Sequence, residues 1–169
     1  MGKRFDQSMG RTLRGFKRGL YEGALRQAAL ARWPGKVPAG RVSHEPWAFW
    51  DFLPTCCDVA SAQTPKGIDG ISFLPSLLGK DKQQQHDYLY WEFHEKQGRV
   101  AIRQGDWKLI RYNVFVPENT TTELYNLIND PGEENNVAQE NPEITSQLLR
   151  LLEIARTPSE DFKFEPRKK

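Results

Sequence analysis

A lysine next to a glycine turn is the first part of the chain that could do chemistry. Lys17 begins the segment 17–23, which reads Lys-Arg-Gly-Leu-Tyr-Glu-Gly. The lysine ammonium is a compact charge with three hydrogen-bond donors, so a lysine held at such a turn can bind an anion. The simpler alternative is a solvated basic loop that precedes a core strand. Spacing alone favours that alternative.

A short apolar run follows this basic segment and ends at a turn that Pro34 and Gly35 enforce. Only Arg26 and Gln27 interrupt the run. The pattern predicts a short buried strand, although periodicity alone cannot separate such a run from a helix. The apolar residues are Leu25, Ala28, Ala29 and Leu30.

The two cysteines, Cys56 and Cys57, are adjacent in the sequence. Neighbouring cysteines rarely bridge each other because the disulfide would be strained. The chain has no Cys-x-x-Cys motif and no cysteine–histidine spacing typical of zinc ligands, so a structural zinc site is not expected. Both cysteines lie in an apolar segment and are predicted to be small buried side chains.

Composition limits the classes of partner. The net charge of +2 is too small to indicate a polyanion partner, and the basic first eighteen residues lack interleaved aromatic residues, so no nucleic-acid partner is expected. No apolar run approaches the roughly 18 residues of a membrane helix, so no membrane partner is expected. Residues 1–6 contain no apolar stretch typical of a secretory signal. The sequence leaves localisation and oligomeric state open.

The first half of the chain is expected to contain short helices between loops. Residues 1–16 read as an irregular lead-in. Residues 46–61 predict two short helices or one kinked helix, with Pro54 at the start of the second. One or two helical turns are expected at 74–78, followed by a polar linker at 80–87. The predicted buried face of the first helical segment consists of Trp47, Trp50, Leu53 and Cys57.

From Tyr88 the pattern changes to alternating residues, which predicts an antiparallel sheet of about four strands near residues 88–94, 100–102, 107–112 and 124–127. Asn141 and Pro142 then predict the start of a helix whose apolar face packs on the sheet. A charged tail, 159–169, is expected to be disordered. The predicted fold class is therefore α+β for this piece.

Several segments together resemble the type I sulfatases of the alkaline phosphatase superfamily, arylsulfatase-like enzymes. Residues 16–26 and 32–35 match a family segment with the pattern K-x-x-x-Y-E-G-G-x-R and then W-P-G. Four further matches follow in the family's order, and the resemblance covers roughly residues 5–155. The family has two glycines where this chain has Gly23 and Ala24, so a Cβ stands where a positive φ could be needed. The further matches are 51–55, 67–72, 103–108 and 123–127 with 130–133.

The resemblance implies an α/β sulfatase architecture. Residues 1–80 would be the incomplete C-terminal end of the large catalytic domain, and residues 81–158 the small subdomain with its sheet and helix. Sulfatases hydrolyse sulfate esters with a formylglycine made from the first residue of a C-x-P-x-R or S-x-P-x-R motif, and with a calcium ion. Neither that motif nor the paired aspartates of the calcium site occurs in this chain. We therefore expect the C-terminal third of a sulfatase, inactive by itself.

The resemblance also assigns candidate site residues. Lys17 matches the lysine that contacts the substrate sulfate, and Glu22 with Arg26 is read as a structural ion pair. His44, His94 and Arg103 are candidate substrate-binding residues, since the first lies in a polar loop and the others on the sheet that leans over the pocket. The alternatives are an ordinary loop histidine, an ordinary strand-end histidine and an ordinary strand arginine.

Two other functions remain open at this point. The chain could be a non-catalytic carbohydrate- or protein-binding module, or a fragment of a sister hydrolase that acts on phosphate esters. A truncated product that folds poorly is a further reading. In the sulfatase interpretation the partner is a sulfated small molecule or glycan. Full-length relatives are typically secreted, periplasmic or lysosomal.

Overall fold

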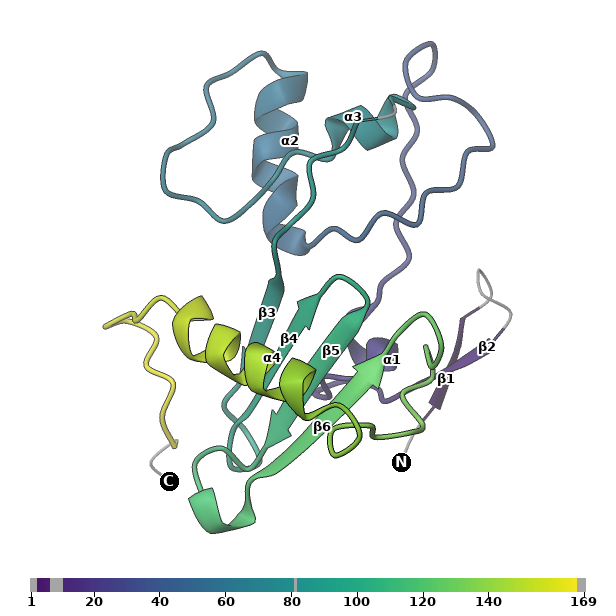
Figure 1. Ribbon diagram of the computed structural model, residues 1–169. Helices are drawn as coiled ribbons and strands as arrows, with labels where there is room; N and C mark the ends of the chain where they lie inside the picture. Colours follow the sequence, from purple (N-terminus) through teal and green to yellow (C-terminus); the bar gives the residue numbers. More distant parts are fainter. Residues whose placement is uncertain (1–2, 7–10, 81, 167–169) are drawn as a thin grey trace. The chain divides into compact units, whose positions relative to one another are not determined.

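The computed structural model describes residues 3–6, 11–80 and 82–166 and divides into two compact units (Figure 1). Unit 1 combines Met1–Gln27 with Tyr88–Lys169, and unit 2 is Ala28–Asp87. This division differs from the expected boundary at residues 80–81, because the segment before Gln27 packs on the sheet that follows Tyr88. That residues 1–80 belong to a catalytic domain stays a prediction.

The sheet of unit 1 confirms the predicted four antiparallel strands. They are β3 (Leu89–Phe93), β4 (Arg99–Gln104), β5 (Trp107–Tyr112) and β6 (Thr121–Asn126), in the order β3-β4-β5-β6. Tight turns connect the first three strands, and both contain a glycine at positive φ, as a hairpin of this kind requires. Because side chains alternate along each strand, the two faces of the sheet carry different residues.

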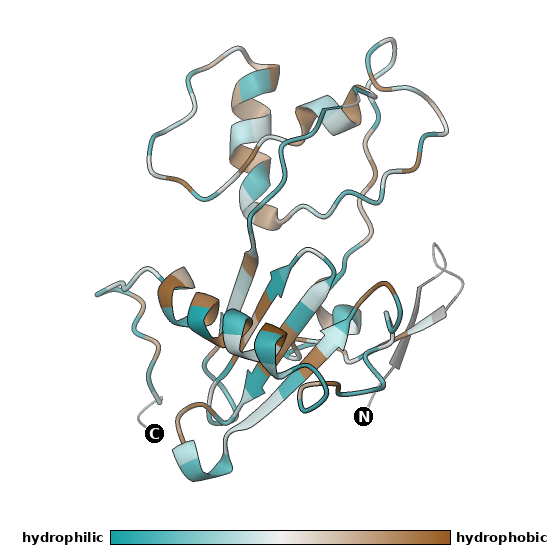
Figure 2. Ribbon diagram, viewed as in Figure 1, coloured by the Kyte–Doolittle hydropathy of each residue, from teal (hydrophilic) through white to brown (hydrophobic). Residues whose placement is uncertain are grey.

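Both faces of this sheet are covered. On one face lies α4 (Pro142–Ala155), whose Leu148 packs against Ile102, Leu109 and Leu124 (Figure 1). Figure 2 shows apolar and polar residues alternating along α4, as expected for a helix with one buried side. The predicted start of this helix is confirmed. Asn141 makes no side-chain capping bond, however, and its amide instead donates to the carbonyl of Val137.

The other face is covered by the segment before residue 27. Leu20 and Tyr21 pack against Ala101, Ile110 and Tyr125 in one buried cluster. The expected irregular lead-in is wrong in part, because β1 (Lys3–Asp6) and β2 (Arg11–Arg14) pair as an antiparallel two-stranded sheet. The sequences of β1 and β2 contain no alternating apolar pattern, so this signal could not reveal the two strands.

The strand predicted from the apolar run after Lys17 is also wrong. Glu22–Leu25 forms the short helix α1, and residues 26–33 lie outside helices and strands. Leu30 is fully exposed, with a relative accessibility of 101%. The run has the composition of a strand but lies against no sheet of the described chain, so its local preference is not realised.

Unit 2 confirms the predicted helices but not their buried face. It contains η1 (Phe49–Asp51), α2 (Phe52–Val59) and α3 (Leu74–Leu77). The buried residues of the first two are Asp51, Pro54 and Thr55, whereas Leu53 is 49% exposed. The predicted burial of the cysteines is likewise wrong, since Cys56 is exposed and Cys57 only half-buried.

A buried carboxylate explains which side of these helices faces inward. Asp51, 1% exposed, accepts backbone hydrogen bonds from Ala48 at 2.7 Å and Ile71 at 2.8 Å. The hydroxyl of Thr55 donates to the Asp51 carbonyl and accepts from the backbone of Phe73. The polar network therefore turns Asp51 and Thr55 inward, and the apolar side chains beside them face outward.

Unit 2 exposes several large apolar side chains. Phe49 is 89% exposed and Phe52 59%. The remaining members of this exposed apolar set are Leu30, Trp33, Val42, Trp47, Leu53, Val59 and Ile68. None of the helices in the described residues is long and apolar enough to cross a membrane.

Candidate functional site

Lys17 lies on a tight turn between β2 and α1. The amide of Gly19 donates to the carbonyl of Phe16 at 2.9 Å, which closes the turn. Arg18 has a φ of 70°, and a positive φ at the third position is typical of a type II turn. Phe16, Lys17 and Arg18 are all exposed. The turn therefore presents the Lys17 ammonium to solvent while its neighbours anchor the backbone.

The residues directly after the turn anchor it to the sheet. Tyr21 is 1% exposed, and its hydroxyl donates to Glu123 Oε2 at 2.6 Å. The Arg14 guanidinium lies 4.0 Å from the centre of the Tyr21 ring and donates to the Tyr125 hydroxyl at 2.8 Å. Burial, with the nearby Glu123 carboxylate, raises the pKa of Tyr21 far above its usual value. Tyr21 therefore acts here as a neutral hydrogen-bond donor.

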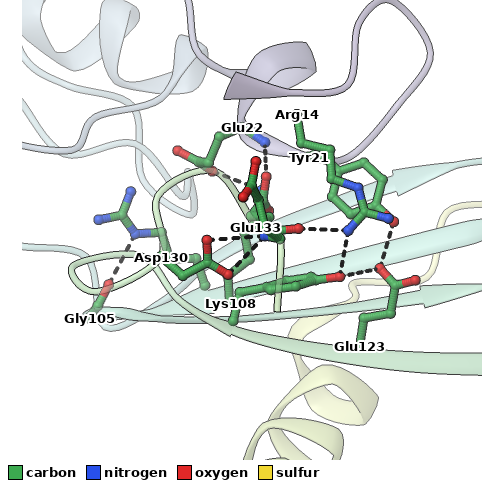
Figure 3. A network of polar contacts seen from close by, with 11 residues as sticks. Arg14, Tyr21, Glu22, Gly105, Lys108, Glu123, Asp130 and Glu133 are labelled. Carbon is green, nitrogen blue, oxygen red and sulfur yellow. Dashed lines mark hydrogen bonds and ion pairs between the residues drawn. The ribbon is translucent and has the colours of Figure 1, made fainter. Parts of the chain in front are cut away.

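A buried charge triad lies beside Tyr21 (Figure 3). Lys108 is fully buried, with its Nζ 2.8 Å from Glu22 Oε1 and 2.9 Å from Glu133 Oε1. The other oxygen of Glu133 accepts the backbone amide of Glu22 at 2.6 Å. One lysine thus joins α1, β5 and the turn after β6. Buried charges are tolerated in proteins when they are paired in this way.

The two carboxylates of the triad have opposite pKa shifts. Burial opposes ionisation of Glu22, but Lys108, with Arg103 and Arg26 adding to its effect, lowers the pKa of Glu22 below its usual value. Burial raises the pKa of Glu133. The attraction of Lys108 only partly offsets this effect of burial, and the negative charge of Glu22 raises the pKa further. Two acids share one cation, and its attraction outweighs the effect of burial on the pKa of Glu22 but not on that of Glu133.

Gly23 is required by close backbone approach. A Cβ at this position would lie 2.5 Å from the Arg14 carbonyl oxygen and 2.6 Å from that of Gly15, so no larger residue fits without movement. Ala24, which replaces the second glycine of the family pattern, lies inside α1 and is not among the described residues with positive φ. The departure from the family pattern is therefore harmless to the backbone.

The expected pairing of Glu22 with Arg26 stays a prediction. Lys108 makes a close contact with Glu22, and the charge of Arg26 also helps to lower the pKa of the Glu22 carboxylate. Sequence reasoning missed Lys108, although a lysine between Trp107 and the apolar pair Leu109 and Ile110 was a usable signal. A lysine in a strand buried on both faces needs a carboxylate partner.

Arg103 lies on the same face of β4 as Ala101, the face that Leu20 and Tyr21 cover. Its Nε donates to the carbonyl of Gly105 at 3.0 Å, and its charge helps to lower the pKa of Glu22. The turn of Lys17 instead contacts Arg99, at the opposite end of the strand. Four residues of strand span about 13 Å. Arg103 and Lys17 therefore share a face but lie apart along it.

His94 lies on the other face of the sheet. Its Nε2 is 4.0 Å from Glu92 Oε1, and Glu92 also accepts a hydrogen bond from Arg156, just after α4. The rings of Phe162 and Phe164 contact His94 with centroid distances of 4.5 and 5.1 Å. Two rings of the tail thus contact His94, whereas most other residues of 159–166 are exposed. Disorder of the tail stays a prediction, and residues 167–169 lie outside the described part. The structure does not bring His94 together with Lys17, and its substrate role stays a prediction.

The other two histidines belong to unit 2. His44 is exposed on a loop, and its substrate role stays a prediction. His86 Nε2 lies 2.9 and 3.0 Å from the two carboxylate oxygens of Asp51. Beside them is a cavity of about 10 Å³, room for about one water molecule. Sequence reasoning assigned nothing to His86, since only the fold brings it to Asp51.

A calcium site does not fit the residues described here. Within residues 3–6, 11–80 and 82–166, no three histidine, cysteine, aspartate or glutamate side chains converge so that they could hold a metal ion. The two buried glutamates are occupied by Lys108. Calcium and formylglycine therefore remain proposals for a complete enzyme.

Comparison with known proteins identifies the family to which this architecture belongs. A family model described as N-sulphoglucosamine sulphohydrolase, C-terminal, matches residues 15–157. The chain belongs to the sulfatase family. The match includes the Lys17 turn, unit 2, the sheet and α4, so it extends over both units and corresponds to the C-terminal part of a sulfatase.

Individual relatives support the same assignment. This sulfatase-family chain is 31% identical to bovine arylsulfatase A over 152 residues, which is 78% of this chain and 30% of the bovine protein. It is 30% identical to an N-acetylglucosamine-6-O-sulfatase of Bacteroides thetaiotaomicron, over 86% of this chain and 27% of that protein. The chain therefore spans less than a third of the length of these two relatives.

Solved structures agree with the fold. A sulfatase described as a 2-O GAG sulfatase superposes with a TM-score of 0.52 at 31% identity, over 61% of this chain and 23% of the other. A second structure, in complex with its substrate D-glucosamine-2-N,6-O-disulfate, gives a TM-score of 0.52 at 30% identity, over 62% and 23%. The mixed α/β architecture with a four-stranded antiparallel sheet and a C-terminal helix is thus that of sulfatases.

Proposed function

We propose that this chain is the C-terminal part of a sulfatase that hydrolyses sulfate monoesters, and that Lys17 is its sulfate ligand. The observation that carries the proposal is the turn at residues 16–19, which presents Lys17 to solvent. The sequence resemblance assigns this lysine to the family's contact with the sulfate. The N-terminal part of such a sulfatase would supply the formylglycine nucleophile and the calcium ligands. By itself the chain is expected to be inactive.

The proposed role of Lys17 is electrostatic. Hydrolysis of a sulfate ester places charge on the oxygens of the transferring group and of the leaving group, and a preorganised cation stabilises that charge. Lys17 would bind the sulfate through its ammonium without moving a proton. The rigid network behind the turn supports this role, because Tyr21 and Glu22 fix the backbone on which Lys17 stands.

The exposed apolar side chains of unit 2 support a covering partner. Burying a phenylalanine side chain such as Phe49 or Phe52 contributes roughly 1.5–3 kcal/mol. The nine members of the exposed apolar set all belong to unit 2, from Leu30 to Ile68, and exposed apolar surface of this kind is stabilised when a partner covers it. We propose that the remainder of a sulfatase, about 70% of the length of the relatives, is this partner.

A sulfated glycan is the proposed substrate class. The N-acetylglucosamine-6-O-sulfatase and the structure bound to D-glucosamine-2-N,6-O-disulfate both act on sulfated amino sugars, according to their names. Arylsulfatase A resembles the chain to a similar degree, so an aryl sulfate is the second substrate to test.

Complementation tests the proposal. The 169-residue chain is co-expressed with the N-terminal part of the Bacteroides N-acetylglucosamine-6-O-sulfatase, ended where the similarity begins, and hydrolysis of glucosamine 6-sulfate is measured. We expect activity only in the mixture, and Lys17→Ala lowers its kcat by roughly 100- to 1,000-fold, as for loss of one oxyanion-stabilising donor.

The matched control is Lys36→Ala, an exposed lysine on a loop of unit 2, which leaves the rate unchanged. Turnover of the substrate by the chain alone would contradict the proposal. Equal rates for the Lys17→Ala mixture and the unaltered mixture would remove the sulfate role of Lys17. Binding of a sulfated sugar without turnover would favour the carbohydrate-binding alternative.

A further inference from the structure

The backbone of the Lys17 turn is held in a conformation that its sequence does not favour. Arg18 has a φ of 70°, in the left-handed region that residues with a Cβ rarely adopt. Glycine would be the ordinary choice at this position of a type II turn. Interactions outside the turn must therefore select this conformation, which determines where the side chain of Lys17 points.

Arg99 makes the closest of these interactions. Its Nη1 donates to the carbonyl oxygen of Arg18 at 2.5 Å, and the residue is only 7% exposed. Its guanidinium carbon lies 5.6 Å from the ring centres of both Phe93 and Tyr112, its two cross-strand neighbours. A charged donor held by two rings on a central strand has little freedom to leave its acceptor.

The rest of the Arg99 side chain strengthens this argument. Its buried Nε has no hydrogen-bond partner among the atoms of the described residues. Buried guanidinium groups normally use their N–H groups in hydrogen bonds. The bond to the Arg18 carbonyl is therefore important for stabilising the buried Arg99 side chain. A surface ion pair between Arg18 and Glu95 at 3.4 Å adds less, because both side chains are partly exposed and screened by solvent.

We propose that Arg99 is a positioning residue for Lys17. It acts through the Arg18 carbonyl, fixes the turn at positive φ and leaves the Lys17 ammonium free for an anion. Arg99 also adds positive charge next to Lys17, and Glu95 is the carboxylate that the structure places on the turn. The catalytic role of this positioning rests on the proposed function. The hydrogen bond from Arg99 to the Arg18 carbonyl, which we call the clamp, can be tested separately.

Amide hydrogen exchange of the 169-residue chain tests the clamp. The Gly19 amide closes the turn, so its protection factor reports the turn directly, and the Ile102 amide in central strand β4 reports unfolding of the sheet. In Arg99→Met we expect Gly19 protection to fall about tenfold or more relative to Ile102, the size expected for a lost hydrogen bond to a charged group.

Arg111→Met is the matched control. Arg111 also stands in a central strand with a buried Nε that lacks a partner in the described chain, but it pairs with Val100 on the opposite face. It should leave Gly19 protection unchanged. Unchanged Gly19 protection in Arg99→Met, or an equal fall in Arg111→Met, would overturn the clamp.

A rescue variant separates positioning from general packing. Glycine adopts a φ of 70° without cost to a Cβ, so adding Arg18→Gly to Arg99→Met should restore Gly19 protection at least about threefold. Absence of any recovery would mean that Arg99 does not act by holding the positive φ, and the proposal would fall.

The complemented enzyme connects the clamp to catalysis. Arg99→Met should lower kcat/KM, and combining it with Lys17→Ala should cost no more than Lys17→Ala alone, because a positioning residue acts through the group it positions. Additive losses would refute positioning. If Lys17→Ala leaves activity intact while Arg99→Met still frees Gly19, the proposed function fails and the clamp stands.

Discussion

Replacement of Lys108 by methionine tests the buried charge triad most directly. Methionine keeps most of the apolar stem but leaves Glu22 and Glu133 without their shared cation. At an effective dielectric constant of about 20, charges at these distances attract by about 6 kcal/mol per pair. Desolvation offsets much of this, and removal of one partner of a buried pair typically costs about 3–5 kcal/mol. We expect a loss of that size at pH 7.

The loss should depend on pH with a defined sign. In the unaltered protein Lys108 lowers the pKa of Glu22, so this contribution is present above the ordinary carboxyl pKa and is lost as the pH falls through the lowered value. Burial already raises the pKa of Glu133 in the unaltered protein, so Glu22 determines how the difference between the two proteins depends on pH. In Lys108→Met burial raises the pKa of Glu22 as well, and the stability of the variant falls by about 1.4 kcal/mol for each pH unit above about 4.5 until that raised pKa is reached. The difference between the proteins should therefore shrink from pH 7 to pH 4.5.

Urea denaturation followed by tryptophan fluorescence measures these free energies of unfolding. The control is Lys163→Met, which removes the same charge from an exposed position in the tail and should change stability by less than about 0.5 kcal/mol. A loss below about 1 kcal/mol for Lys108→Met would refute the reasoning. So would a loss that stays constant between pH 4.5 and pH 7.

Two further predictions concern backbone fit and unit 2. Gly23→Ala places a Cβ 2.5 Å from the Arg14 carbonyl oxygen and should lower the free energy of unfolding, measured in urea, by about 3 kcal/mol. The control Ala24→Gly, in the same helix, should lower it by about 1 kcal/mol or less. A larger loss for Ala24→Gly than for Gly23→Ala would contradict the close approach. Asp51→Asn replaces one carboxylate oxygen by an NH₂ group, which cannot accept a hydrogen bond, and should lower the free energy of unfolding by about 1–3 kcal/mol. This loss should exceed that of His86→Ala, because two backbone amides also donate to the Asp51 carboxylate. Chemical denaturation of both variants, followed by the tryptophans of unit 2, would show a larger loss for His86→Ala if the histidine were the main partner.

The sheet and its helix were predictable because their signals are local. Alternation from Tyr88 onward sets the strands, and the Asn141–Pro142 pair marks the start of α4. The helices of unit 2 were predictable for the same reason, but not their inward face. Asp51 turns inward through hydrogen bonds to residues as far as Ile71 and His86, and side-chain periodicity carries no information about such partners.

The candidate site was predictable only in part. Lys17 and its glycine turn could be read from the sequence, whereas the groups that hold the turn come from distant strands. Arg99 is 81 residues from Arg18, and Glu133 is 111 residues from Glu22. The strand expected after Lys17 failed for a related reason. Residues 26–33 have strand-like composition, but β structure requires a neighbouring strand, which composition does not supply.

The discontinuous make-up of unit 1 has a consequence for synthesis on the ribosome. The contact between the Glu22 amide and Glu133 closes over 111 residues, so the N-terminal segment leaves the ribosome long before its acceptor exists. At about 5–20 residues per second, that delay is roughly 6–22 s. During this interval Leu20 and Tyr21 have no core to enter, while all of Ala28–Asp87 is synthesised. The segment that carries Lys17 is thus made before unit 2 but reaches its final place only after Glu133 has been made.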